Sequence, residues 1–349
     1  MQKIVHPQHY EYVHPIFLEI EQFFSMTSEK AMHNNALFNP SFDNAFIDLH
    51  RLFSYYGNAD YDVKFVNKKY SPIHLSNYDE KNMILCFSGG KDGVACLKHY
   101  MDEGYKVYLY HVPKINPSQN RDETNQAIKI AERFNVPIYV EDIKISGKHD
   151  WVEHPMKNMI IAECAIQWGI KNNIGYNIAF GNYITSTLKD DNFAFCGGDD
   201  IEMWCVFEDI LRTILPSFEM NLYLENAFHT MSIVCSDKEL LDMTVSCLGR
   251  ASLRKRNKEW VETTFGVKLP THRCGQCGKC CAEYTWMVEN GLQPFNKEYY
   301  AYCLNRLRLS LNKEHEVSNT SIEDVCDSFM IPKDSEYLKM ALTVNKKVK

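Results

Sequence analysis

The sequence predicts an α/β protein with a doubly wound, mostly parallel sheet, a cysteine-rich metal-binding lobe and extra helices at both ends. Two observations lead to this prediction. From residue 82 onward, short apolar runs alternate with segments whose apolar residues recur at helical spacing, a pattern typical of parallel sheets covered by helices. Farther along, four cysteines fall within residues 274–281, which scattered core cysteines do not explain.

The alternating part begins with a buried strand at 82–87 and a helix at 94–103. The elements expected after them are a strand at 106–112, a helix at 120–134, a strand at 137–142, a helix at 157–172 and a strand at 176–180. Outside this part, helices are expected at 17–24, 45–53, 299–311 and 321–330. Ligands of parallel sheets bind at the carboxyl ends of the strands, so we expect the binding site in the segments that follow them.

Charge and composition exclude some classes of function. With 38 Lys and Arg against 45 Asp and Glu, the net charge of −7 excludes a globally basic nucleic-acid binder. The N-terminus lacks the apolar core of a signal peptide, and no run reaches the roughly 18 apolar residues of a membrane helix. We therefore expect a cytoplasmic protein without membrane contact, whose 13 cysteines are thiols or metal ligands rather than disulfides.

A glycine-rich segment separates the first expected strand from the first expected helix. Its residues, all expected to bind a phosphate-bearing cofactor, are Ser88, Gly89, Gly90, Lys91, Asp92 and Gly93. Glycine permits positive φ and close backbone approach, and the N–H groups that begin a helix bind anions. Lys91 would neutralise charge developing on the phosphates, and Asp92 would hold Mg²⁺ directly or through water.

The cysteine cluster contains the array Cys274, Cys277 and Cys280, spaced C-x-x-C-x-x-C. Such tight turns let thiolates converge on one ion, and a structural Zn²⁺ takes four nitrogen or sulfur ligands. The candidates for the fourth ligand are Cys247, Cys281, His272 and a residue farther away. Cys281 follows Cys280 directly, so binding by both would strain the backbone. A [4Fe–4S] cluster is the main competing interpretation, and a set of unligated thiols is the third.

These motifs resemble those of the PP-loop ATP pyrophosphatases, and in particular the 7-cyano-7-deazaguanine synthase (QueC) family. The segment 88–93 is similar to the SGGxDS motif of PP-loop enzymes. Weaker matches follow in the family's order at Asn120-Arg121, at Pro155-Met156-Lys157-Asn158, at Gly181-Asn182 with Asp190 or Asp191, and at Thr244-Val245-Ser246-Cys247. The resemblance implies that Lys157, Asn158, Gly181 and Asn182 bind the nucleotide, and that Cys247, Cys274, Cys277 and Cys280 hold the zinc.

The chain departs from the family at three places. Gly93 replaces the final serine of the loop motif, Lys157 replaces an arginine, and 248–273, 26 residues in all, separate the first two implied zinc cysteines. This insert carries the basic run Arg250–Lys258, interpreted as a solvated helix face, with contact to nucleic acid or a phosphate-bearing substrate as the alternative. Together the departures suggest a divergent relative of the kind found in phage or in anti-phage defence.

The resemblance implies an ATP-dependent carbon–nitrogen ligase. The family activates a carboxylate on a 7-deazapurine-type nucleobase, releases pyrophosphate and AMP, and uses ammonia to form an amide and then a nitrile. It implies ATP with Mg²⁺ and a structural Zn²⁺ as cofactors, catalytic roles for Lys91 and Asp92, and a place in 7-deazaguanine chemistry such as queuosine biosynthesis. A homodimer or an operon partner protein is a further expectation.

The chain then divides into an N-terminal extension (1–80), a PP-loop ATP-binding domain (81–235), a zinc and substrate lobe (236–290) and a helical C-terminal extension (291–349). Two other functions remain open. One is a PP-loop tRNA sulfurtransferase or phosphosulfate-reductase-like enzyme, with Cys281 or Cys196 as the redox thiol. The other is a non-catalytic nucleotide-binding component of a complex, which the replacement of serine by Gly93 favours.

Overall fold

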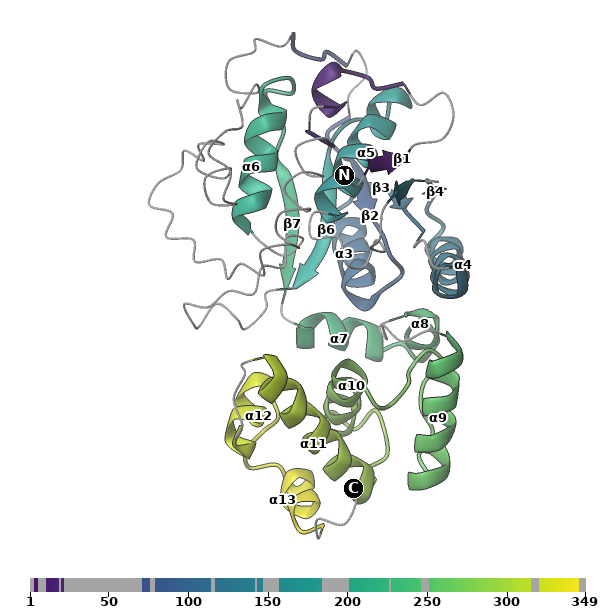
Figure 1. Cartoon of the computed structure of the whole chain (residues 1–349), viewed down its shortest axis with the longest axis vertical. Coiled ribbons are helices and arrows are strands. Elements are labelled where there is room, and N and C mark those ends of the chain that lie inside the picture. Colours follow the sequence, from purple (N-terminus) through teal and green to yellow (C-terminus); the bar gives the residue numbers. More distant parts are fainter. Residues whose placement is uncertain are drawn as a thin grey trace. The chain divides into compact units, whose positions relative to one another are not determined.

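A computed structural model of the chain describes residues 3–5, 11–18, 20–21, 71–75, 79–113, 117–141, 143–146, 157–183, 201–225, 227–245, 251–314 and 320–344. The chain forms two compact units (Figure 1). The first comprises residues 1–88 and 96–225, and the second comprises residues 89–95 and 226–349. The short segment 89–95 therefore groups with residues more than a hundred positions later in the chain.

The first unit is built on a five-stranded, entirely parallel sheet with the order β4-β3-β2-β6-β7. Its strands are β2 (Asn82–Cys86), β3 (Lys106–His111), β4 (Ile138–Val140), β6 (Ile178–Tyr183) and β7 (Met220–Glu225). The α/β class and the parallel sheet are confirmed, and β2 is the central strand. The edge strand β7 was not predicted, although its apolar residues alternate as a half-buried strand requires.

The register of the strands assigns each side chain to one face of the sheet. Ile84 of β2 lies level with Tyr108 of β3 and with Ile178 of β6. Because successive side chains of a strand point to opposite faces, these residues share one face while Leu85 and Leu109 point to the other. Ile84, Ile178, Leu85 and Leu109 are all buried, which explains why these strands read as continuous apolar runs.

The helices of this unit are α3 (Lys91–Asp102), α4 (Pro117–Phe134), α5 (Lys157–Lys171) and α6 (Ile201–Arg212). Two of them pack on the face that carries Ile84. The ring of Trp168 in α5 lies 5.7 Å from that of Tyr110, and the ring of Trp204 in α6 lies 5.1 Å from that of Phe180. Both strand residues belong to that face.

The other two helices pack on the opposite face. The ring of His99 in α3 lies 4.9 Å from that of Tyr223 in β7. Nε2 of His111, at the end of β3, lies 2.9 Å from Oγ1 of Thr124 in α4. Helices therefore cover both faces of the sheet, as the alternation of elements predicts.

Helix α5 lies directly on the central strand at Gly169. A Cβ atom at this position would come within 2.2 Å of Cδ1 of Ile84 and within 2.4 Å of the carbonyl oxygen of Gly175. Only glycine avoids these collisions. The close approach fixes β2, the strand that leads into the glycine-rich segment.

The described part of the N-terminal extension packs into the core of the first unit. Ile16, Phe17 and Ile20 have no exposed surface, and the N–H of Val13 donates to Oε1 of Gln167 in α5 at 3.1 Å. The helix predicted at 17–24 is described only over 15–18 and 20–21, and the one at 45–53 lies outside the described residues. A separate antiparallel pair joins β1 (Lys3–Val5) to β5 (Lys144–Ser146).

The described elements of the second unit, besides the start of α3, are helices. They are α7 (Ala227–Cys235), α8 (Lys238–Met243), α9 (Ala251–Phe265), α10 (Gly278–Glu289), α11 (Lys297–Glu314), α12 (Ile322–Ser328) and α13 (Glu336–Leu342). Helices α9 to α13 share one core, rich in buried tyrosines such as Tyr284, Tyr299 and Tyr300. The predicted helices at 299–311 and 321–330 correspond to α11 and α12, whereas α13 was not predicted. None of the described helices has the length and apolar character needed to span a membrane.

Candidate functional site

The glycine-rich segment lies at the carboxyl end of the central strand, where the sequence placed it. The N–H of Phe87 donates to the carbonyl oxygen of Tyr110 at 2.9 Å, which extends the pairing of β2 with β3 to the edge of the loop. Gly89 then turns the chain with a φ of 76°, a value that favours glycine. Helix α3 begins two residues later at Lys91.

Lys91 forms a three-membered polar group with Asp92 and Thr230. Nζ of Lys91 lies 2.5 Å from Oδ1 of Asp92 and donates to Oγ1 of Thr230 at 3.2 Å. The hydroxyl of Thr230 donates in turn to Oδ1 of Asp92 at 2.9 Å. Thr230 lies in α7, 139 positions along the chain, and has no exposed surface. Sequence reasoning missed this partner because nothing local indicates it.

The placement of Lys91 is costly unless a negative charge is nearby. Its side chain is largely buried, with 7% exposed surface, at the helix N-terminus, where the backbone dipoles disfavour a cation. Asp92, in the first turn of α3, offsets this cost. A cation held at a helix N-terminus concentrates positive potential at the point where the backbone N–H groups already favour an anion.

The carbonyl oxygen of Gly89 is also held from within the second unit. It accepts the N–H of Val245 at 3.2 Å. The preceding residue, Thr244, is bound by Arg273, whose Nη1 donates to its carbonyl oxygen at 2.5 Å and whose Nη2 donates to its hydroxyl at 3.0 Å. Arg273 also forms a buried ion pair with Glu283. Thr244 and Val245 belong to the weak T-W-S-C match, but no local sequence pattern indicates the ion pair.

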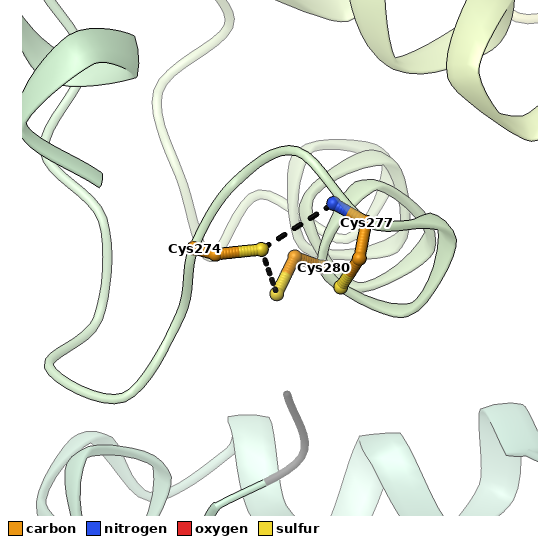
Figure 2. Close-up of side chains that lie close together, drawn as sticks. All are labelled: Cys274, Cys277 and Cys280. Carbon is orange, nitrogen blue, oxygen red and sulfur yellow. Dashed lines mark hydrogen bonds between the residues drawn. The ribbon is translucent and has the colours of Figure 1, made fainter. Parts of the chain in front are cut away.

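The three cysteines of the array converge as predicted (Figure 2). Their sulfur atoms lie within 4.8 Å of one another, and those of Cys274 and Cys280 are 3.8 Å apart. The N–H groups of Gln276 and Cys277 point at Sγ of Cys274, each at 3.4 Å. Gly275, with a φ of 70°, makes the tight turn that follows Cys274.

This arrangement fits a metal ion. N–H groups directed at a sulfur orient it and stabilise it as a thiolate ligand. Cys277 caps the N-terminus of α10 and Cys280 lies in its first turn, where the helix dipole favours negative sulfur. Within the described residues the group consists of Cys274, Cys277 and Cys280, and Cys247, the predicted fourth ligand, lies outside those residues.

Cys281 does not join the group. Its sulfur lies 3.7 Å from the carbonyl oxygen of Gly275, on the side of the C-terminal core. Burial, and then Cys303, raise its pKa well above the ordinary range. A buried thiol that resists ionisation is a poor nucleophile, which disfavours Cys281 as a redox thiol. Cys196, the other candidate, lies outside the described residues.

The remaining predicted nucleotide contacts fall in the first unit. Asn158 lies half-buried in the first turn of α5, and Gly181 is paired with Tyr223 at the carboxyl half of β6. Lys157 and Asn182 lie in the same elements, but their side chains are outside the described ones. Their role in nucleotide binding stays a prediction.

In the basic run predicted at 250–258, two lysines lie one helical turn from acidic residues, whereas Arg254 is buried. In α9, Nζ of Lys258 lies 3.8 Å from Glu262 and donates to the carbonyl oxygen of Pro270 at 3.1 Å. Lys255 is exposed and lies 4.0 Å from Glu259. Acidic neighbours one turn away are typical of a solvated helix face, and they weaken the case for a nucleic-acid surface.

A second buried group of ionisable side chains, which sequence reasoning missed, lies in the first unit. Ligand atoms of Glu21, Glu163 and Cys164 lie within 4.8 Å of one another. The hydroxyl of Tyr12 donates to Glu21 at 2.8 Å, and Gln167 donates to Glu163. Burial, and then Glu21, raise the pKa of Glu163 well above its usual value. The raised pKa favours the neutral form of Glu163, and the contact with Glu21 fastens the N-terminal segment to α5.

Comparisons with known proteins do not identify the chain, since neither a protein-family model nor a curated protein matches its sequence.

Proposed function

We propose that the chain is an ATP-using enzyme of the PP-loop type, which cleaves ATP to AMP and pyrophosphate to activate a carboxylate. The observation that carries this proposal is the group of Lys91, Asp92 and Thr230 at the start of α3. It lies directly after Gly89, at the carboxyl end of the central strand of a parallel sheet, the usual ligand-binding edge of such sheets.

The side chains present suit a nucleotide triphosphate. Lys91 supplies a buried positive charge where the leaving pyrophosphate accumulates negative charge. Asp92 supplies the carboxylate that Mg²⁺ of the nucleotide prefers. On nucleotide binding, Lys91 exchanges Asp92 for phosphate oxygens, and the carboxylate becomes available to the cation. The hydroxyl of Thr230, which bonds to both residues, provides the oxygen that the loop lacks at Gly93.

The reaction that the resemblance implies can be written with balanced bonds. A carboxylate oxygen attacks the α-phosphorus of ATP, and the bond to pyrophosphate breaks. Ammonia then attacks the acyl carbon, AMP leaves and an amide forms. The amide oxygen then attacks the α-phosphorus of a second ATP and a second pyrophosphate leaves. Loss of AMP, which carries the amide oxygen, and of two protons from the nitrogen leaves a nitrile. A carboxylated 7-deazapurine as acceptor rests on the resemblance alone.

The cysteine group serves a structural role in this proposal. Cys274, Cys277 and Cys280 would hold one ion with a fourth ligand, for which we propose Cys247. Zn²⁺ is preferred over an iron–sulfur cluster because one small ion suits three sulfurs at this spacing. A bound Zn²⁺ would cross-link the turn before α10 and would take no part in the chemistry at the phosphate.

Two observations bear on the alternative functions. The burial of Cys281 disfavours sulfur transfer through that thiol. The replacement of serine by Gly93 favours a second candidate, a nucleotide-binding component of a complex that has lost catalysis. AMP formation separates this candidate from the enzyme.

The test is to incubate the purified protein with Mg²⁺, ATP, ammonium and 7-carboxy-7-deazaguanine, and to identify the products by mass spectrometry. The proposal expects AMP and pyrophosphate together with the amide or the nitrile. AMP without either product would retain the PP-loop chemistry and replace the acceptor. Nucleotide binding without AMP would favour the non-catalytic candidate, and no binding would reject both.

A further inference from the structure

The cysteine group and the glycine loop are joined by a short chain of hydrogen bonds within the second unit. Cys274 is preceded directly by Arg273. Arg273 donates to both oxygens of Thr244, and the next residue, Val245, donates its N–H to the carbonyl oxygen of Gly89. Arg273, Thr244 and Val245 thus connect the turn that carries the cysteines to the loop that carries Lys91.

The buried end of this chain is anchored on the helix that the cysteines begin. Glu283, which pairs with Arg273, lies on α10, three positions after Cys280. Arg273 and Glu283 are both about 2% exposed at their side chains. The position of the guanidinium is therefore set from two sides, by the turn before α10 and by α10 itself.

Cys235 of α7 is close enough to Arg273, Glu283 and Lys91 to be influenced by all three charges. Burial, and then Glu283, raise its pKa to about 12, while Arg273 and Lys91 lower it. One thiol thus responds to the Arg273–Glu283 pair and to Lys91. The same helix carries Thr230, the partner of Lys91.

We propose that Arg273 is a positioning residue through which the ordered cysteine group holds the glycine loop in place. Its guanidinium fixes Thr244, and Val245 in consequence fixes the carbonyl oxygen of Gly89. Loss of the metal loosens the turn at Cys274, releases this contact and frees the loop. The coupling between the cysteine group and the glycine loop does not depend on the proposed function. Its consequence for nucleotide binding rests on that function.

Arginine is needed at this position for a geometric reason. It donates at the same time to Glu283, to the carbonyl oxygen of Thr244 and to its hydroxyl. A planar guanidinium presents these donors in a fixed fork, whereas an ammonium group is a single compact charge. Arg273→Lys keeps the positive charge opposite Glu283 but loses the paired hydrogen bonds to Thr244.

The test is amide hydrogen exchange of the nucleotide-free protein, read at Val245 and in the peptide that covers Gly89 to Ala95. Metal content is measured in parallel by elemental analysis. Arg273→Lys should accelerate exchange at Val245 roughly tenfold or more, the size expected for losing a hydrogen bond to a charged group, with its metal content unchanged. Removing the metal from the wild-type protein with a chelator should have the same effect, and should add little in Arg273→Lys. The exposed Arg308→Lys serves as the matched control and should change nothing.

Unchanged exchange at Val245 in metal-loaded Arg273→Lys would overturn the inference, as would unchanged exchange after chelation of the wild type. If Arg273→Lys does not fold, Thr244→Val replaces it: this variant removes one of the two bonds from Arg273, and normal exchange at Val245 would count against the coupling. Because no nucleotide is present, these results are independent of AMP formation. A protein that shows the coupling but makes no AMP contradicts only the proposed function.

Discussion

The two units bury ionisable side chains in opposite ways. In the first unit, Glu163 lies beside Glu21, and burial and then Glu21 raise the pKa of Glu163, which favours its neutral form. In the second unit, Arg273 pairs with Glu283 and Lys91 pairs with Asp92. The first pair is accommodated by favouring the neutral form of one carboxyl. The pairs of opposite charge instead keep full charges inside the protein, where each charge is stabilised by its partner.

The largest effect is expected from removing a sulfur of the cysteine group. Cys277→Ala should lose the metal and with it several kcal/mol of stability, because metal binding supplies folding free energy in sites of this kind. Solubility, metal content and thermal unfolding measure this, with Lys279→Ala, at an exposed position of the first turn of α10, as the control. A soluble, metal-free variant with normal unfolding would contradict a structural metal.

Breaking the buried ion pair of the second unit comes next. Arg273→Met leaves the Glu283 carboxylate without its partner and should lower the free energy of unfolding by about 3–5 kcal/mol. The double variant Arg273→Met with Glu283→Leu should recover much of this loss, since a well-packed apolar pair replaces a buried ion pair at little cost. Urea unfolding measures both. Equal losses in the single and double variants would show that the pair is not the cause.

Removing the loop cation should affect catalysis more than folding. Lys91→Ala should reduce AMP formation about 100-fold or more, by analogy with the loss of one charge-stabilising donor in an active site, while the unfolding temperature changes little. Lys98→Ala, on the same helix α3, should retain wild-type AMP formation. Equal rates for Lys91→Ala and wild type would place the active site elsewhere.

The hydroxyl of Thr230 should matter less than the charge of Lys91. Thr230→Val keeps the shape of the side chain but removes the hydrogen bonds to Lys91 and Asp92. We expect a roughly tenfold loss of AMP formation, the worth of one hydrogen bond to a charged group, and recovery in Thr230→Ser. Steady-state kinetics that show the same loss in both variants would indicate a packing role instead.

The smallest effect is expected in the first unit and depends on pH. Because burial and Glu21 raise the pKa of Glu163 above its usual 4.5, the folded state holds a proton that the unfolded chain releases. The contribution of Glu163 to stability is therefore fully present below pH 4.5 and is lost as the pH rises through the raised pKa. Glu21, Cys164 and Gln167 lie against this carboxyl, and the hydroxyl of Tyr12 donates to Glu21. Glu163→Gln should flatten this pH profile and stabilise the neutral protein by about 1 kcal/mol. Parallel profiles of unfolding temperature between pH 5 and pH 8, differing by a constant, would assign the slope to another group.

The sequence could predict features that depend on local patterns, but not contacts between residues that are distant in sequence. Apolar runs at strand spacing and the C-x-x-C-x-x-C spacing are local, so four strands of the sheet and the convergence of Cys274, Cys277 and Cys280 were predictable. The partner of Lys91 was not, because Thr230 is 139 positions away and is one of many threonines. The Arg273–Glu283 pair was equally hidden, since its members are ordinary charged residues until the turn before α10 brings them together.

There is also a physical reason why strand β7 and helix α13 were not predicted. Strand β7 is an edge strand, and its alternation over six residues is too short to stand out. Helix α13 spans only seven residues, and the capping hydroxyl of Ser335 is its main local signal. The family resemblance, the acceptor and the fourth metal ligand remain predictions.

The contacts of Gly89 and Lys91 also have a consequence for synthesis of the chain. The ribosome releases the loop together with β2, but the residues that hold it emerge much later: Thr230 comes 139 residues after Lys91, and Val245 comes 156 residues after Gly89. At translation rates of about 5–20 residues per second, this delay is on the order of ten seconds. A nascent or truncated chain can complete its central strands during this time without the contacts that hold the glycine loop. These contacts form only after Thr230 and Val245, about two thirds of the way along the 349 residues, have been made.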